Sequence, residues 1–233
     1  MQLAAVIAAG GKGIRLGRNV RKQYLSLGSK PMLAHSVGLF AGHEAVSQIV
    51  VAIPEGDFIS ANGILSTYFP VELYQLVAGG ATRQQSINKA LEAIKGKPDL
   101  VAVHDAARPL ASANLLNKLI EAALEDGAAV PVIPLADTAK QVDKKGMVLS
   151  TPPRESLRLV QTPQVFRFSL IVEAYSNAER SGLEATDDSA LIELLGKPVR
   201  TVEGELSNLK VTSALDLALA TILFDGRKGE GLK

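Results

Sequence analysis

The sequence contains no cysteine, and this absence excludes disulfide bonds, thiolate metal ligands and a cysteine nucleophile. An excess of either charge is also missing, because 25 Lys and Arg residues are balanced by 24 Asp and Glu residues. A domain that binds DNA or RNA is expected to be basic, so nucleic acid is not the expected partner. Histidine is scarce, and His35, His43 and His104 match no zinc-binding spacing. Any anion site must therefore depend on a few well-placed cations.

Long hydrophobic runs are missing as well. The apolar stretch at the N-terminus ends at Gly10, and no basic segment precedes it. It is too short for a membrane span and lacks the charged start of a signal peptide. We therefore expect this stretch to be a buried first strand, and the protein to be cytoplasmic without a membrane partner.

Short runs rich in Val and Ile alternate with segments of helical periodicity. Apolar residues make up 47% of the chain and charged residues 21%, which is typical of a folded domain. The alternation predicts an α/β protein with a doubly wound, mostly parallel, Rossmann-like sheet. Strands are predicted at 3–8, 49–53, 71–76, 100–104, 128–133 and 199–202. Helices are predicted at 32–40, 83–94, 115–124, 169–180, 188–195 and 214–224.

A polar hairpin interrupts this alternation. Residues 140–149 read KQVDKKGMVL, with two short polar and apolar pieces on either side of a Lys-Lys-Gly turn. The segment is too polar for the core, so we expect it to protrude as a β-hairpin arm. It is either a solvated surface hairpin or an arm that contacts a second subunit. We expect residues 1–233 to form a single domain, with the arm at about 138–157.

A glycine-rich loop follows the first predicted strand. Residues 8–15 read AAGGKGIR, and glycines allow backbone N–H groups to approach phosphate oxygens closely. The loop matches neither the dinucleotide fingerprint nor the P-loop. It carries Arg15, and Lys22 follows. Fixed cations of this kind would stabilise the charge that develops when a triphosphate is attacked at its α-phosphate, unless both are solvated surface residues.

Three further charged residues are candidates for the same site. Asp105 follows the fourth predicted strand, where a carboxylate could bind Mg²⁺ or a hydroxyl group. Alternatively, Asp105 caps the next turn and pairs with Arg108. Arg154 lies at the base of the hairpin and Lys210 just before the last helix, but spacing alone assigns neither of them.

Eight short motifs spread over nearly the whole chain carry a family resemblance. In their order and residues they resemble the cytidylyltransferases that act on 2-C-methyl-D-erythritol 4-phosphate in the non-mevalonate route to isoprenoids. They are AAGGKGIRLG (8–17), RKQYL (21–25), GGATRQQSI (79–87), HDAARP (104–109), DTAK (137–140), TPQVF (162–166), TDDSA (186–190) and EGELSNLKVT (203–212).

The resemblance implies a nucleotidyltransferase fold, a homodimer, Mg²⁺ or another divalent cation, and transfer of CMP from CTP with release of pyrophosphate. Arg15 and Lys22 would stabilise the transition state, aided by Arg154 and Lys210. Through the arm, Thr138 and Arg154 would serve the site of the other subunit. The implied CTP-binding residues are Ala8, Ala9, Gly10, Gly11, Gly13, Gly80, Arg83, Ser86 and Ala106. The implied residues for the alcohol phosphate are Asp105, which is also the metal candidate, Thr138, Arg154, Thr162, Thr186 and Lys210.

Two positions depart from the family pattern, and two other functions stay open. Ser207 and Ala81 stand where acidic residues are common in the family. One alternative is a ribitol 5-phosphate cytidylyltransferase, although Ala107 favours methylerythritol because the ribitol enzymes more often carry a bulkier residue there. The other is a non-catalytic CTP-binding module, which would not need Lys22, Arg154 and Lys210 together.

Overall fold

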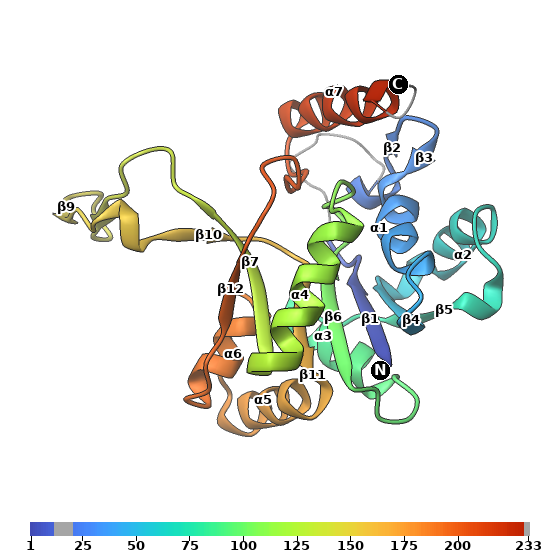
Figure 1. The fold of residues 1–233 in the computed structure, drawn as a ribbon, viewed down its shortest axis with the longest axis horizontal. Coiled ribbons are helices and arrows are strands. Elements are labelled where there is room, and N and C mark those ends of the chain that lie inside the picture. The colour runs from blue at the N-terminus through green and yellow to red at the C-terminus, as the bar shows by residue number, and fades with distance from the viewer. Residues whose placement is uncertain (12–20, 231–233) are drawn as a thin grey trace.

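A mostly parallel sheet occupies the centre of the computed structural model, which describes residues 1–11 and 21–230 (Figure 1). Its strands are β1 (Leu3–Ala8), β4 (Val46–Ile53), β5 (Tyr74–Ala78), β6 (Leu100–Asp105), β7 (Ala128–Pro134), β10 (Arg158–Val160), β11 (Gln164–Arg167) and β12 (Arg200–Glu203). Their order is β10-β7-β11-β6-β1-β4-β5, and β12 pairs with β7. The pairs among β1, β4, β5 and β6 are parallel, whereas β10 and β11 run antiparallel to their neighbours. The predicted fold class is confirmed.

Helices cover both faces of this sheet and bury its apolar strands. The helices are α1 (Met32–Ala41), α2 (Phe58–Ser66), α3 (Arg83–Glu92), α4 (Ala113–Asp126), α5 (Phe168–Ser181), α6 (Asp188–Leu194) and α7 (Ala214–Glu230). Alternate residues of β1 belong to two different cores, because successive side chains of a strand point to opposite faces. One core contains residues of α1, α2 and α4, and the other contains residues of α3, α5 and α6. The sheet is therefore doubly wound.

Several elements differ from the prediction, including the strands β10 and β11, which are not among the predicted strands. The predicted strand at 71–76 is wrong in its first half, because Val71–Leu73 forms a 3-10 turn after Pro70 and the strand begins at Tyr74. The sequence analysis also predicted no helix at Phe58–Ser66. That helix buries only Ala61 and Leu65, so its apolar pattern is weak.

A third, smaller apolar cluster joins the two ends of the chain. It packs α7 against the hairpin of β2 (Ser26–Leu27) and β3 (Lys30–Pro31). Phe224 of α7 lies against the turn of this hairpin, at Gly28. Gly28 has a φ of 60°, and a Cβ atom there would lie 2.4 Å from Phe224 Cε1. Only glycine therefore fits this turn beneath α7.

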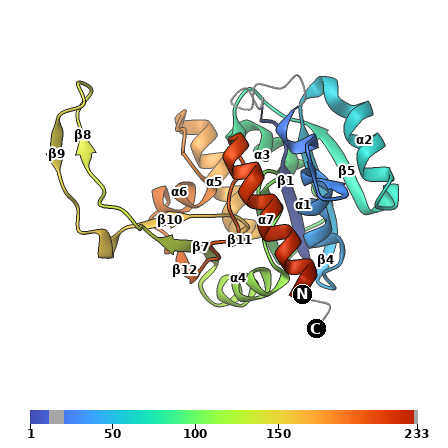
Figure 2. The same cartoon turned by 90° about the horizontal axis from the view of Figure 1, so that it is seen from above.

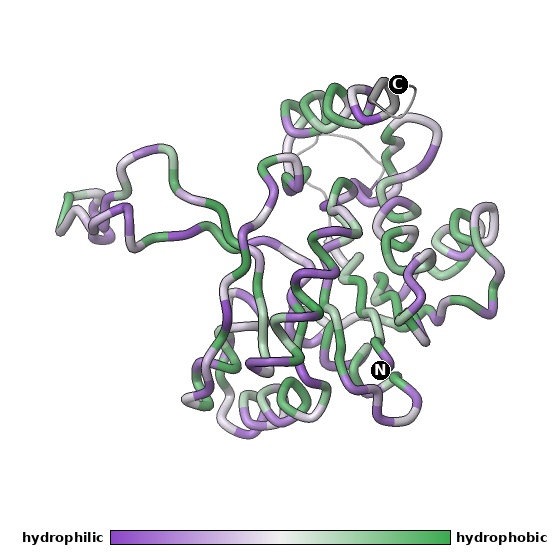
Figure 3. The backbone as a smooth tube through the Cα atoms, in the orientation of Figure 1, coloured by the Kyte–Doolittle hydropathy of each residue, from purple (hydrophilic) through white to green (hydrophobic). Residues whose placement is uncertain are grey.

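The hairpin of β8 (Gln141–Val142) and β9 (Val148–Ser150) extends away from the body, as predicted (Figures 1 and 2). Hydrophobic stretches lie on this arm although it leaves the core (Figure 3). Its exposed apolar residues are Val142, Met147, Val148 and Leu149. In the described part of the chain, no helix is both long and apolar enough to cross a membrane.

Candidate functional site

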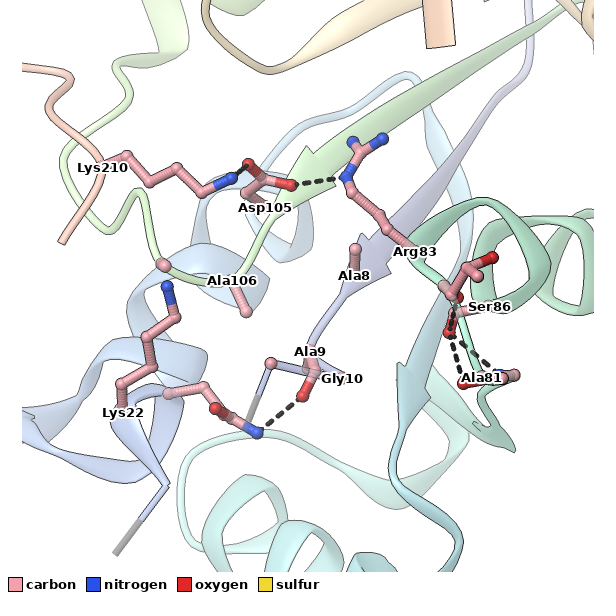
Figure 4. Close-up of a pocket in the computed structure, with 15 residues that line it drawn as sticks. Ala8, Ala9, Gly10, Lys22, Ala81, Arg83, Ser86, Asp105, Ala106 and Lys210 are labelled. Atoms are coloured by element: carbon pink, nitrogen blue, oxygen red, sulfur yellow. Dashed lines mark hydrogen bonds and ion pairs between the residues drawn. The ribbon is translucent and has the colours of Figure 1, made fainter. Parts of the chain in front are cut away.

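A cavity opens at the carboxyl ends of β1, β5 and β6 (Figure 4), where ligands bind in open parallel sheets. It brings together the predicted CTP-binding residues, except Gly13, which lies outside the described residues together with Arg15. We call it the first cavity. It is lined by Ala8, Ala9, Gly10, Gly11, Lys22, Gln23, Gly80, Ala81, Thr82, Arg83, Ser86, Asp105, Ala106, Ala107 and Lys210.

Backbone groups form much of the first cavity's wall. Ser86 Oγ accepts a hydrogen bond from Gly80 N at 2.9 Å and donates one to the Thr82 carbonyl at 2.8 Å. A Cβ atom at Gly79 would lie 2.8 Å from Ser86 Oγ, so the two segments approach too closely for a side chain. On the other side, Gln23 Nε2 donates to the Ala9 carbonyl at 2.6 Å and holds the loop after β1. Hydrogen bonds within the chain therefore hold both the loop after β1 and the segment after β5.

Two lysines from opposite ends of the chain meet at the first cavity. Lys22 lies in the 3-10 turn Lys22–Tyr24, and its Nζ donates to the Val211 carbonyl at 3.2 Å. Lys210 Nζ lies 2.7 Å from Asp105 Oδ2. In Figure 4 both ammonium groups lie near Ala106. Two of the predicted catalytic cations thus share one cavity.

Asp105 is held between two cations. Its Oδ1 accepts from Arg83 Nε at 3.1 Å, and its Oδ2 pairs with Lys210. Burial alone would raise the pKa of Asp105, but the charges of Arg83, Lys210 and Arg108 outweigh burial and hold this pKa far below its usual range. Arg108, the alternative partner, donates instead to the carbonyls of Asn208 and Val160. The carboxylate therefore stays ionised at any physiological pH.

A second cavity lies on the other side of Asp105. Three residues, Arg83, Asp105 and Lys210, line both cavities and form the wall between them. Thr162 and Thr186, predicted to bind the alcohol phosphate, line this second cavity. Its full lining is Arg83, Asp105, Arg108, Val160, Gln161, Thr162, Gln164, Thr186, Asp187 and Lys210.

Thr138 and Arg154 lie apart from both cavities. Arg154 is exposed on the arm, where its guanidinium donates to the Ala136 carbonyl at 3.2 Å and lies 3.9 Å from Glu155. Neither residue is among those that line the two cavities in the described part of the chain. Within one subunit, the structure therefore does not bring these two predicted site residues to either cavity.

The two departures from the family pattern have local partners in the structure. Ser207 Oγ accepts a hydrogen bond from Arg227 at 2.8 Å, so position 207 ties the loop before α7 to that helix. At Ala81, the backbone N–H donates to Gln85 Oε1 at 2.9 Å. Neither position supplies a carboxylate to the first cavity.

Some residues of the site were not singled out from the sequence. Gln23 holds the loop after β1, and Asp188 accepts two hydrogen bonds from Arg83. Both lie inside the quoted motifs, RKQYL and TDDSA. The available signal for Asp188 was a charged residue two positions after the expected contact Thr186.

The buried side chain of His104 forms hydrogen bonds to Arg108 and Thr162, which both line the second cavity. Its Nε2 lies 3.1 Å from the Arg108 carbonyl and its Nδ1 lies 3.0 Å from Thr162 Oγ1. Because a carbonyl only accepts, Nε2 carries the proton, and Nδ1 accepts from the threonine hydroxyl. Thr162 Oγ1 in turn accepts from Asp105 N at 3.0 Å. Burial lowers the pKa of His104 to about 4, so the ring is neutral.

This buried histidine makes stability depend on pH. In the unfolded chain His104 becomes protonated below about pH 6.5, whereas in the folded chain it stays neutral down to about pH 4. Stability is therefore complete above that window and falls by on the order of 3 kcal/mol as pH drops through it. We expect His104→Gln to flatten this part of the curve, measured by urea unfolding without added metal. His43→Gln is the matched control, and an unchanged slope in His104→Gln would contradict the argument.

The fold and the site define an α/β nucleotidyltransferase. The chain belongs to the 2-C-methyl-D-erythritol 4-phosphate cytidylyltransferase family, whose profile matches residues 3–225. It is 41% identical to the enzyme of that name from Syntrophotalea carbinolica over 227 residues, which cover 97% of each chain. The enzyme from Alkaliphilus metalliredigens is 37% identical over 228 residues, which cover 97% of this chain and 95% of the relative.

Solved structures agree with this assignment. The 2-C-methyl-D-erythritol 4-phosphate cytidylyltransferase from Thermus thermophilus is 38% identical, with a TM-score of 0.77 over 96% of this chain and 98% of that one. The 4-diphosphocytidyl-2C-methyl-D-erythritol synthase from Anaerococcus prevotii is 30% identical, with a TM-score of 0.85 over 96% of each chain. The family resemblance stated from the motifs is confirmed.

Proposed function

We propose that this enzyme transfers CMP from CTP to 2-C-methyl-D-erythritol 4-phosphate, giving 4-diphosphocytidyl-2-C-methyl-D-erythritol and pyrophosphate. The observation that carries this proposal is the wall of Arg83, Asp105 and Lys210 shared by two cavities. CTP in the first cavity and the alcohol phosphate in the second would bring their reacting phosphates together at this wall. The narrow, backbone-lined part of the first cavity would select a pyrimidine over a purine.

The transfer needs charge stabilisation more than proton transfer. A phosphate monoester is largely dianionic near pH 7, so its oxygen attacks the α-phosphorus of CTP without a general base. Charge then builds on the α-phosphate and the departing pyrophosphate. Lys22 and Lys210 are already fixed at the cavity and would stabilise that charge more than the ground state. Arg15, outside the described residues, is proposed for the same role.

We propose that Mg²⁺ enters the site with the triphosphate. Among the described residues, no group of three or more His, Asp or Glu side chains could hold a metal ion. Mg²⁺ is commonly bound by one or two carboxylates together with substrate phosphates, and Asp105 is the carboxylate of the first cavity. Its donor type and low pKa fit that role. When bound, the ion neutralises charge on phosphate oxygens.

We also propose a homodimer in which the arm of each subunit completes the site of the other. The arm extends from the body and carries exposed apolar residues, which a second subunit would bury. Thr138 and Arg154 would then reach the second cavity of the partner, where the guanidinium would bind the phosphate of the alcohol substrate. We propose the cytoplasm, where CTP is available, as the place of the reaction.

The test is a pyrophosphate-release assay with CTP and Mg²⁺. We expect turnover with 2-C-methyl-D-erythritol 4-phosphate, none with ATP in place of CTP, and none after chelation of the metal. Turnover of ribitol 5-phosphate alone would assign the chain to that substrate instead. Binding of CTP without turnover of either alcohol phosphate would favour a CTP-binding module.

A further inference from the structure

A second carboxylate is buried directly behind the wall. The side chain of Asp188, the first residue of α6, is 0% exposed. It accepts both ends of the Arg83 guanidinium, with Oδ1 3.1 Å from one terminal nitrogen and Oδ2 2.8 Å from the other. The remaining nitrogen, Arg83 Nε, donates to Asp105. A single guanidinium therefore joins a buried carboxylate to the carboxylate that separates the cavities.

Tyr175 of α5 fixes the buried end of this arrangement. Its hydroxyl donates to Asp188 Oδ1 at 2.5 Å, and the residue is only 3% exposed. Burial, reinforced by the negative charge of Asp188, raises the pKa of the Tyr175 hydroxyl, which therefore remains a donor. The described linings of the two cavities contain neither Asp188 nor Tyr175. The side chain of Asp188 is hydrogen-bonded to one residue of the wall, Arg83.

We propose that Asp188 and Tyr175 are positioning residues for the transfer, which act through Arg83 to fix Asp105 and Lys210 at the wall. This inference rests on the proposed function. Arg83 starts α3, and its long side chain would be mobile if its end were not held. A bidentate carboxylate sets both the position and the plane of a guanidinium. Asp105 is then held at one oxygen by Arg83, and its other oxygen holds Lys210.

Asp188 also sets the charge of the wall. Alternating charges run from Asp188 through Arg83 and Asp105 to Lys210. Removing the charge of Asp188 leaves an extra positive charge beside the phosphates and a guanidinium free to turn toward them. Such a group would bind the ground-state triphosphate as well as the transition state, which does not accelerate the reaction. Loss of Asp188 should therefore lower kcat without raising KM for CTP.

Steady-state kinetics in a double-mutant cycle test this role. We expect Asp188→Asn to lower kcat by about tenfold with no rise in KM for CTP, as for loss of hydrogen bonds to a charged group. In an Arg83→Gln background, the same substitution should change kcat by less than about twofold, because the guanidinium through which Asp188 is proposed to act is absent. Equal losses in the two backgrounds would overturn the proposal, and so would a wild-type kcat in Asp188→Asn.

Another Asp–Arg pair with two hydrogen bonds, more exposed than that of Asp188, provides a control away from the site. Arg200 of β12 donates through two nitrogens to Asp126 of α4, at 2.6 and 3.3 Å. This pair lies near Ala129, at the amino end of β7, away from the cavities. Asp126→Asn should leave kcat and both KM values unchanged. If it reproduced the effect of Asp188→Asn, the effect would be general destabilisation and the proposal would fail.

A measurement without substrate separates this proposal from the proposed function. In ¹⁵N-labelled wild-type protein, the Nε–H of Arg83 should exchange slowly with water because Asp105 accepts it. Asp188→Asn should speed this exchange at least tenfold, and an unchanged rate would refute the positioning role even if the enzyme transfers CMP. Tyr175→Phe removes a single hydrogen bond and should give an intermediate rate, which provides the test if Asp188→Asn does not fold. If no alcohol phosphate is turned over, only the proposed function fails.

Discussion

Lys22→Ala should lower kcat by about 10²–10³-fold, the usual loss when one preorganised donor to a transition state is removed. Lys22 lines the first cavity, and its Nζ is held by the Val211 carbonyl beside Ala106. Because this ammonium group is fixed before the substrate binds, it would need no reorganisation as charge develops. KM for CTP should change much less than kcat, since the charge it opposes is greatest in the transition state.

Lys30→Ala is the control for this substitution. Lys30 belongs to the adjacent hairpin, but its ammonium lies 5.3 Å from the ring centre of Tyr68, and it does not belong to the described lining of either cavity. It should retain the wild-type kcat. Turnover in the pyrophosphate assay is the measurement for both variants. A wild-type kcat in Lys22→Ala would remove the central cation from the mechanism.

Mixing two impaired variants should restore about a quarter of the wild-type activity. Arg154→Ala should bind the alcohol phosphate poorly, and Lys22→Ala should lack one of the cations of the first cavity. If each arm serves the partner's site, a mixed dimer has one site that lacks both residues and one intact site. Random exchange makes half of the dimers mixed, so about a quarter of all sites regain both groups, following two-fold symmetry.

This experiment distinguishes an arm that serves the partner from one that serves its own subunit. An arm that served its own subunit would leave every site of the mixture defective. The mixture would then show no more activity than the average of the two variants. Loss of Arg154 is expected to raise KM for the alcohol phosphate by about ten- to a hundredfold, as for loss of a charge-assisted contact. The assay should therefore use the alcohol phosphate at a concentration below its KM. Light scattering would report whether dimers form at all.

Local pattern predicted the central strands of the sheet well because β1 and β6 are buried on both faces. The strand Leu3–Ala8 was predicted with its exact bounds, because a short, continuous apolar run is typical of a parallel strand that is buried on both faces. The error at Val71–Leu73 has a local cause, because Pro70 is followed by a turn that apolar content alone does not indicate. The helix Phe58–Ser66 was missed since little of it is buried.

The pairings within the site could not be read from the sequence. Family motifs placed Arg83 and Asp105 in the same site, but not the carboxylate that holds Arg83 from a position 105 residues away. The one partner that the sequence offered for Asp105, as an alternative to a ligand role, was Arg108, three residues further along the chain. The structure pairs Asp105 with Arg83 and Lys210 instead, which come from distant elements. Such pairings are set by tertiary packing.

The contact between Lys22 and the Val211 carbonyl spans 189 residues. Its neighbours, the hairpin at Gly28 and α7 with Phe224, pack into a cluster separate from the two main cores. A ribosome therefore has to translate nearly the whole message before Lys22 acquires this acceptor. Nascent chains that end before Val211 should already hold most of the sheet and yet be unable to turn over nucleotide.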